Sequence, residues 1–390
     1  MRRREELDHK ILSYMFRHGH APRPELVAYT GIRAATVFES VDRLKESGLL
    51  IEPTRRGKKT GRKAPELECN PAFAHWVGLD LNTVNVTAVV TDNNGRILHE
   101  VIHSAGNRTN AEDVFAEVFA ALTALQEKAG KDWFKVCGTG FSDPGPVDLR
   151  QGVSLNAVNI PGWQNVETVK RLERETALPC GLWTDEMVRA HQAYLARQQE
   201  APERLLHICL GSTIGSGFVI DGKIYYGSHG KAMEIGHLVI DPAGPLCSCG
   251  SCGCLEAMLS LKNLSEHLQA QKQAGLSTAL DPDRLTLSAL LAASPDDEGV
   301  RELIRYIGSG VGKALIPVVT LLDPDLIVLS GELAQLRERL LHPIAEQLDK
   351  NCLQGAASKV KIEFSSQKEN DTARGAALLM RDRVLLSQLV

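Results

Sequence analysis

The sequence predicts an α/β protein of two or three domains, with a smaller, basic, helical domain at its N-terminus. Its 390 residues exceed what one ordinary core accommodates. Residues 1–63 contain 15 Lys and Arg against 8 Asp and Glu, whereas the rest of the chain contains 29 against 40. From about Phe73 onward, short apolar runs alternate with helical periods, as in an α/β domain. The basic end is therefore expected to meet a polyanion.

The first 50 residues predict three short helices. The first is amphipathic and ends at Gly19. The second begins near Arg23, tolerates Pro24 in its first turn because an N–H there has no intrahelical partner, and ends at Gly31. The third runs from about residue 34 to residue 47. The inward face of the first helix consists of Leu7, Ile11, Leu12, Met15 and Phe16. The inward face of the third helix consists of Val37, Val41 and Leu44.

A turn-rich basic run, residues 54–65, follows these helices and predicts a hairpin. Three helices and a basic hairpin are typical of an α+β winged helix-turn-helix domain, here residues 1–70, that binds DNA through phosphate and base contacts. The alternatives are a basic module that contacts proteins, or a solvated linker. The candidate DNA contacts are Arg33, Thr36, Ser40, Arg43 and Arg62.

Four cysteines fall within eight residues, from Cys247 to Cys254, and His237 precedes them. Cysteines this close in sequence more often bind a metal than each other, although a disulfide or simple buried thiols are alternatives. One imidazole and three thiolates suit a closed tetrahedral Zn²⁺ site without an open position for chemistry. The pattern therefore predicts a structural zinc site.

This segment resembles the zinc module of the ROK family (repressors, open reading frames and sugar kinases), in which a histidine precedes the pattern CxCGxxGCxE. The resemblance implies that His237, Cys247, Cys249 and Cys254 are the zinc ligands, with Cys252 as a fifth candidate. Other stretches resemble the same family: residues 138–147 its GxGxPGxV turn, with one additional residue, and residues 159–163 its NLPGW motif.

The resemblance covers essentially the whole chain and implies an actin-like, two-lobed sugar-kinase fold after the winged helix-turn-helix domain. The first α/β lobe is expected to comprise residues 71–186 and 375–390. The second α/β lobe, with the zinc module and the sugar site, is expected over residues 187–374.

The resemblance also implies a sugar site. Sugars offer hydroxyl groups, so carboxylates that accept hydrogen bonds and amide or imidazole groups that complement them are the expected partners. His237 can bind zinc with one ring nitrogen and face the sugar with the other. In a kinase, Asp185 would be the catalytic base. The sugar-binding candidates are Asn159, Thr184, Asp185, Glu234, His237 and Glu256.

The phosphate-binding turns depart from the kinase pattern. Asn82 stands at the first small position after Asp80, Thr213 interrupts the second glycine turn, and residues 328–332 lack the diglycine of the third. Side chains at these positions hinder the approach of backbone amides to phosphate. ATP and Mg²⁺ are therefore not expected as cofactors.

Two functions from different classes fit these observations. The first is a sugar-responsive transcriptional regulator, which is expected to be a repressor. Its expected partners are operator DNA, a sugar or sugar phosphate effector, and further copies in a homodimer or homotetramer. The second is an ATP-dependent sugar kinase with an accessory DNA-binding domain. No apolar run is long enough to span a bilayer and no secretory leader is visible, so a cytoplasmic protein is expected.

Overall fold

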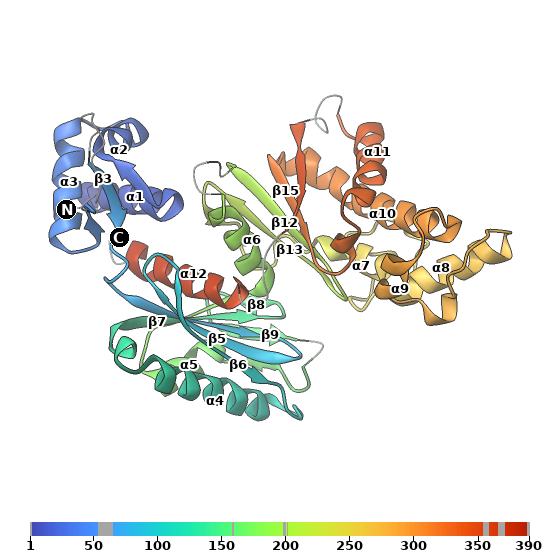
Figure 1. The fold of residues 1–390 in the computed structure, drawn as a ribbon, viewed down its shortest axis with the longest axis horizontal. Helices are drawn as coiled ribbons and strands as arrows, with labels where there is room; N and C mark the ends of the chain where they lie inside the picture. The colour runs from blue at the N-terminus through green and yellow to red at the C-terminus, as the bar shows by residue number, and fades with distance from the viewer. Residues whose placement is uncertain are drawn as a thin grey trace. The chain divides into compact units, whose positions relative to one another are not determined.

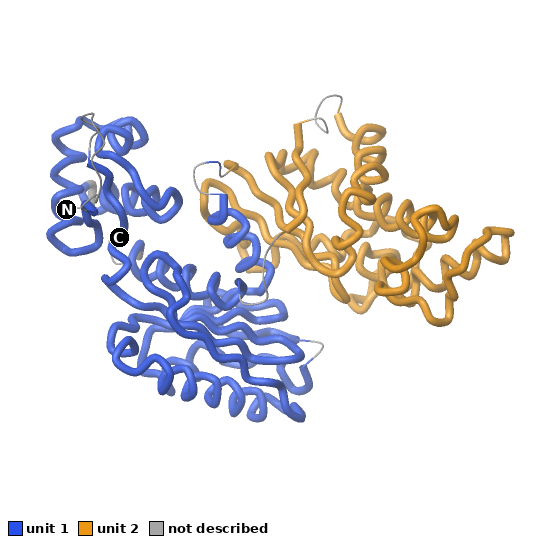
Figure 2. The backbone as a smooth tube through the Cα atoms, in the orientation of Figure 1, with its two compact units in different colours: residues 1–201, 368–390 blue, residues 202–367 orange. Residues whose placement is uncertain are grey.

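The computed structural model describes residues 2–53, 65–157, 160–197, 200, 202–353, 359–365 and 371–387. The chain forms two compact units, residues 1–201 with 368–390 and residues 202–367 (Figure 2). This division differs from the expected one, because helix α6 (Asp185–Leu195) belongs to unit 1 instead of opening the second lobe. It packs on the C-terminal helix α12 (Asp371–Ser387), where Gln192 Nε2 donates to the Asp371 carbonyl at 2.9 Å.

The N-terminal part of unit 1 has the helices and short strands of the expected winged helix-turn-helix domain (Figure 1). The predicted basic hairpin, residues 54–65, lies outside the described residues except for Pro65. Gly31 adopts the left-handed conformation, with φ 67°, at the turn between the second and third helices. Three short antiparallel strands pair in the order β1-β3-β2, and the first of them was not expected from the sequence. The elements are α1 (Arg2–His18), β1 (His20–Pro22), α2 (Arg23–Thr30), α3 (Ala34–Glu46), β2 (Leu50–Ile51) and β3 (Glu66–Cys69).

The α/β lobe of unit 1 is a five-stranded sheet with the order β11-β7-β4-β5-β6. Figure 1 shows α4 and α5 on one face of this sheet and α12 on the other. A small antiparallel sheet, β10-β9-β8, adjoins it. The elements are β4 (His75–Leu81), β5 (Asn85–Asp92), β6 (Ile97–Ser104), α4 (Ala111–Ala129), η1 (Gly130–Lys135), β7 (Val136–Asp143), β8 (Val147–Asp148), β9 (Val153–Asn156), β10 (Gln164–Val166), α5 (Thr168–Thr176) and β11 (Cys180–Thr184).

Unit 2 contains a second five-stranded sheet, ordered β14-β13-β12-β15-β16, which is packed against helices. The strands are β12 (Arg204–Leu210), β13 (Ile214–Ile220), β14 (Lys223–Ile224), β15 (Leu326–Ser330) and β16 (Lys361–Phe364). The helices are η3 (Ile235–His237), α7 (Leu255–Leu259), α8 (Leu261–Gln273), η4 (Pro282–Arg284), α9 (Leu287–Ala292), α10 (Glu298–Leu322), η5 (Leu333–Leu340) and α11 (Leu341–Asn351).

The two sheets repeat one topology. In each, the first strand pairs antiparallel with the second, the second antiparallel with the third, and the first parallel with the fourth, which pairs parallel with the fifth. A duplicated α/β lobe of this kind agrees with the actin-like fold expected from the sequence. Within the described residues, no helix has both the length and the apolar character needed to cross a bilayer.

The winged helix-turn-helix and the first lobe share one apolar core. Leu12 and Met15 of α1 belong to the same buried cluster as Trp76 of β4 and Met380 of α12. All four side chains are at most 1 % exposed. Helix α1 is therefore seated on the lobe by apolar burial and is not tethered by a linker alone.

Candidate functional site

The four predicted zinc ligands converge in unit 2. His237 ends η3, Cys247 and Cys249 lie in the following loop, and Cys254 stands directly before α7. Their ligand atoms all lie within 4.8 Å of one another, and Cys252 is not among them. Gly253 closes the loop, because its φ of 72° is left-handed and an added Cβ would lie 1.5 Å from the Asp241 carbonyl oxygen. The geometry therefore favours the set of four.

The spacing of these atoms fits a tetrahedral zinc site. Zn–S bonds of about 2.3 Å place two sulfur ligands about 3.8 Å apart at the corners of a tetrahedron. The Sγ atoms of Cys249 and Cys254 are 3.6 Å apart, and Cys247 Sγ lies 3.6 Å from His237 Nδ1. Burial raises the pKa of the Cys254 thiol to about 12. A divalent cation that binds here would displace this proton and stabilise the thiolate.

The unit 2 residues of the predicted sugar site lie within or beside this module in the sequence. His237 turns Nδ1 toward Cys247, which leaves Nε2 for another partner. The Glu256 carboxylate, on α7, accepts a hydrogen bond from the Ile214 backbone N–H at 2.9 Å. Glu234 is exposed directly before η3. The contacts of His237 and Glu256 therefore connect these two predicted sugar contacts with the zinc loop and with the second glycine turn.

The unit 1 residues of the predicted sugar site lie at the start of α6. Thr184 is the N-cap residue, and its hydroxyl oxygen accepts from the Met187 backbone N–H at 3.2 Å. Asp185 follows with a side chain that is 25 % exposed and lies 3.8 Å from Arg189. Burial, followed by the neighbouring Glu186 carboxylate, raises the pKa of Asp185 to about 8. Asn159, the remaining candidate, lies outside the described residues.

Asp143 anchors the motifs of the first lobe and was missed in the sequence. Its carboxylate accepts from Trp163 Nε1 at 2.9 Å, from the Gly145 N–H at 2.9 Å and from the Ser154 hydroxyl. It is fully buried, and burial raises its pKa to about 6. Asp143 lies in residues 138–147, the stretch that has one residue more than the family pattern. The signal available in the sequence was an acidic residue inside this stretch.

The first phosphate-like turn is closed by its own side chain. The Asn82 side-chain oxygen accepts from the backbone N–H groups of Val84 and Asn85, each at 2.9 Å. Asn82 Nδ2 also donates to the side-chain oxygen of Asn85 at 3.0 Å. In a phosphate-binding turn, such N–H groups face the anion. In the second turn, the Gly211 N–H donates to the Thr213 carbonyl at 3.2 Å.

The structure of helix α3 contradicts part of the prediction of DNA contacts. Arg33 and Thr36 are exposed, as a groove contact requires. Ser40 is fully buried and donates to Asp8, so the expectation that its side chain faces DNA is wrong. It lies between Val37 and Leu44 on the inward face, which the helical period could have indicated. Arg43 Nη2 is held 2.7 Å from Asp8 Oδ1. Arg62 lies outside the described residues.

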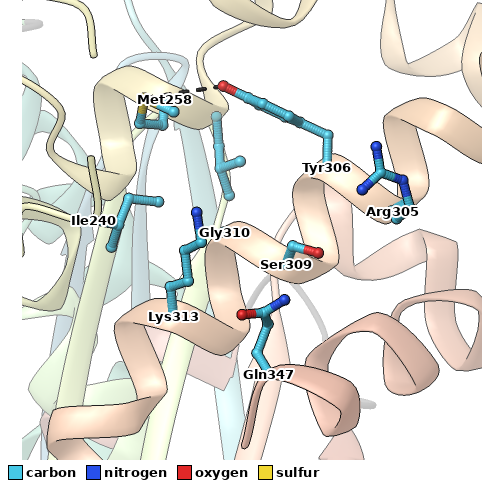
Figure 3. Close-up of a pocket in the computed structure, with 9 residues that line it drawn as sticks. Ile240, Met258, Arg305, Tyr306, Ser309, Gly310, Lys313 and Gln347 are labelled. Carbon is cyan, nitrogen blue, oxygen red and sulfur yellow. Dashed lines mark hydrogen bonds between the residues drawn. The ribbon is translucent and has the colours of Figure 1, made fainter. Parts of the chain in front are cut away.

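A cavity of about 190 Å³ lies elsewhere in unit 2, along α10 (Figure 3). Lys313 and Gln347 point into it, and the Tyr306 ring forms one wall. Arg305 at its rim is paired with Glu302 at 2.7 Å. None of the predicted sugar or metal residues lines it, so it is separate from the site that the motifs indicate. Its lining is Ile240, Met258, Leu259, Arg305, Tyr306, Ser309, Gly310, Lys313 and Gln347.

Comparison with known proteins gives one consistent result. The model of the ROK family matches residues 76–383. The putative xylose repressor of Caldicellulosiruptor sp. (strain Rt8B.4) is 24 % identical over 379 residues, which are 95 % of this chain and 94 % of that protein. The glucokinase of Thermotoga maritima is 24 % identical over 314 residues, 79 % of this chain and 98 % of its own.

A solved structure has the same fold over the full length. The crystal structure of a ROK family transcriptional regulator, described as a homologue of the E. coli MLC protein, superposes with a TM-score of 0.83 at 23 % identity and covers 100 % of this chain and 99 % of its own. This structural similarity agrees with the duplicated lobes and with the family match over residues 76–383. The chain belongs to the ROK family.

Proposed function

We propose that this protein is a sugar-responsive transcriptional regulator, acting as a repressor of genes of carbohydrate metabolism. The observation that carries the proposal is the winged helix-turn-helix that precedes the family domain and shares its core. Similarity to the xylose repressor extends over 95 % of the chain, whereas similarity to the glucokinase extends over 79 %. The additional N-terminal segment contains the winged helix-turn-helix, which an operator-binding protein needs and a kinase does not.

Operator binding would use α3 and the basic segment after it. Two copies related by a twofold axis would present two α3 helices to successive major grooves, so a homodimer or homotetramer and a palindromic operator are expected. The test is selection of duplexes from fragmented genomic DNA by the full-length protein. A shared palindromic motif supports the proposal, and recovery of unrelated fragments contradicts it.

The effector would be a sugar or sugar phosphate recognised by polar side chains that the family resemblance indicates. The candidate contacts described by the structure are Thr184, Asp185, Glu234, His237 and Glu256. Thermal denaturation in the presence of xylose, glucose, N-acetylglucosamine and their 6-phosphates tests this point, because a ligand at 100 times its Kd adds about 2.7 kcal/mol of stability. Structural Zn²⁺ on His237 and the three cysteines would hold the unit 2 contacts in place.

Sugar affinity should depend on pH through Asp185. Its pKa is raised to about 8, so the carboxyl is mostly protonated at pH 7. A sugar hydroxyl that donates to Asp185 needs the ionised form, so affinity should rise about ninefold from pH 6 to 7 and about fivefold from pH 7 to 8, and level off above. Calorimetric titration with a neutral sugar at pH 6, 7, 8 and 9 measures this dependence. A flat profile in the native protein would exclude Asp185 as the acceptor.

Helix α6 offers a route from the sugar to the DNA-binding domain. Asp185 begins α6 and Tyr194 lies near its end, where the Arg17 guanidinium of α1 is 5.1 Å from the centre of the tyrosine ring. Arg381 of α12, on which α6 packs, lies 4.0 Å from the centre of the Phe16 ring. We propose that sugar binding at the start of α6 displaces α1 through these contacts.

This coupling predicts that Arg17→Met weakens the effect of sugar on operator affinity and leaves the sugar affinity unchanged. A cation–π contact contributes about 0.5–1 kcal/mol at a partly exposed site, so the effect of sugar on operator affinity should shrink about two- to fivefold. Fluorescence anisotropy of a labelled operator gives the effect, and calorimetry gives the sugar affinity. The control is Lys10→Met, which removes a cation 5.5 Å from the Tyr29 ring inside the same domain. An equal loss in both variants would refute the route.

The alternative is an ATP-dependent sugar kinase, in which Asp185 would be the catalytic base. Against it, the Asn82 side chain occupies the N–H groups of the first turn. We expect no phosphorylated sugar in a coupled ATP-consumption assay with excess ATP and Mg²⁺. Turnover on the order of 1 per second, an ordinary rate for a kinase, would favour the alternative.

A further inference from the structure

The outward face of α3 carries acidic side chains where a DNA-binding helix usually carries basic or amide groups. The inward face consists of Val37, Ser40, Val41 and Leu44, all buried. The exposed residues on the opposite face are Ala35, Glu39, Asp42 and Glu46. A helix that brings this face into the groove of a polyanion must offer each carboxylate a cation or a hydrogen-bond donor, because unpaired carboxylates and phosphates repel.

Asp42 already has such a partner, but Glu39 does not. Arg23 Nη2 is 2.7 Å from Asp42 Oδ1, and the same guanidinium lies 5.3 Å from the centre of the Phe38 ring. Glu39, about one turn nearer the N-terminus of α3, forms no hydrogen bond or ion pair with any residue that the structure describes. The small residues at positions 34 and 35 let this turn approach base edges closely.

We propose that Glu39 recognises a cytosine in each operator half-site by accepting a hydrogen bond from its N4 amino group in the major groove. A carboxylate can only accept, and the major-groove edge of cytosine presents a lone donor. Guanine presents acceptors alone, and adenine presents a donor beside an acceptor, which suits an amide better. The inference rests on the proposed DNA-binding function and assigns part of its sequence specificity.

The test compares full-length native protein with the Glu39→Gln and Glu39→Ala variants on a randomised duplex library, followed by titration of duplexes that differ at one base pair. Glu46→Gln is the matched control, because it lies on the same face at the far end of the helix. The native protein should prefer C at one symmetric position about 5- to 150-fold, equivalent to about 1–3 kcal/mol. Glu39→Ala should lose this preference, Glu39→Gln should shift it toward adenine, and the control should keep it.

The proposal is overturned if Glu39→Ala retains every base preference of the native protein and binds all duplexes more tightly, because Glu39 would then be a repulsive charge and not a base contact. That result would leave the proposed function intact. Failure of the native protein to enrich any duplex would instead remove the proposed function, and this assignment with it.

Discussion

Cys249→Ser should lose the metal from the protein and destabilise unit 2. Purified native protein is expected to contain about one zinc per chain, as a single four-ligand site implies. Loss of a structural metal is among the few single changes that cost about 4 kcal/mol or more, which is about 10 °C in the unfolding midpoint for a domain of this size. Atomic emission of dialysed protein and a thermal scan measure the two effects.

Cys252→Ser is the matched control for this experiment. Cys252 lies in the same loop and is exposed, but its sulfur is not among the four ligand atoms that converge. The control should keep its zinc and its stability. Equal zinc loss in both variants would mean that Cys252 is a ligand, and absence of zinc from freshly reduced native protein would overturn the metal assignment altogether.

Asp185→Asn should remove most of the sugar affinity while operator binding without sugar stays intact. An amide presents donors where the carboxylate accepts, so a charged hydrogen bond worth about 1.5–3 kcal/mol is lost, or about 10- to 150-fold in affinity. The effect should be largest near pH 9, because the pKa of Asp185 is about 8 and the native carboxylate is ionised there. Calorimetric titration at pH 9 and pH 7 checks both statements.

Glu200→Gln provides a control with the same chemical change, from carboxylate to amide, on the exposed surface beyond the end of α6. It should leave the affinity unchanged at both pH values. Unchanged affinity in Asp185→Asn, combined with loss of ATP-dependent turnover, would instead identify Asp185 as the base of a kinase.

Features that depend on short stretches of sequence could be predicted from the sequence. The candidate zinc ligands lie close together in the sequence, so their spacing predicts a metal site, and the family resemblance implies the four residues that converge in the structure. The turn at Gly31 and the start of the second helix at Arg23 also depend on local backbone preferences. The closed turn at Asn82 was expected to disfavour phosphate, and the structure adds the reason, since asparagine bonds its own backbone.

Features that depend on distant contacts could not be predicted in the same way. Asp143 is held by groups 11 and 20 residues away, Ser154 and Trp163. The helical period indicates that Ser40 faces inward, but it does not indicate its partner Asp8, which lies 32 residues earlier. Helix α6 belongs to unit 1 because it packs on a C-terminal helix nearly 180 residues later, where the hydrogen bond from Gln192 spans 179 positions. Such partners are set by tertiary packing, which periodicity does not encode.

The most direct test of the account is the operator affinity of the full-length, zinc-loaded protein with and without sugar. A duplex selected from genomic DNA is titrated by fluorescence anisotropy in the presence of xylose, glucose, N-acetylglucosamine or their 6-phosphates. The account predicts that at least one of these ligands changes the Kd for the operator by about 5- to 150-fold, the usual range of allosteric coupling. An operator Kd that none of them changes, together with ATP-dependent phosphorylation of one of the sugars, would contradict it.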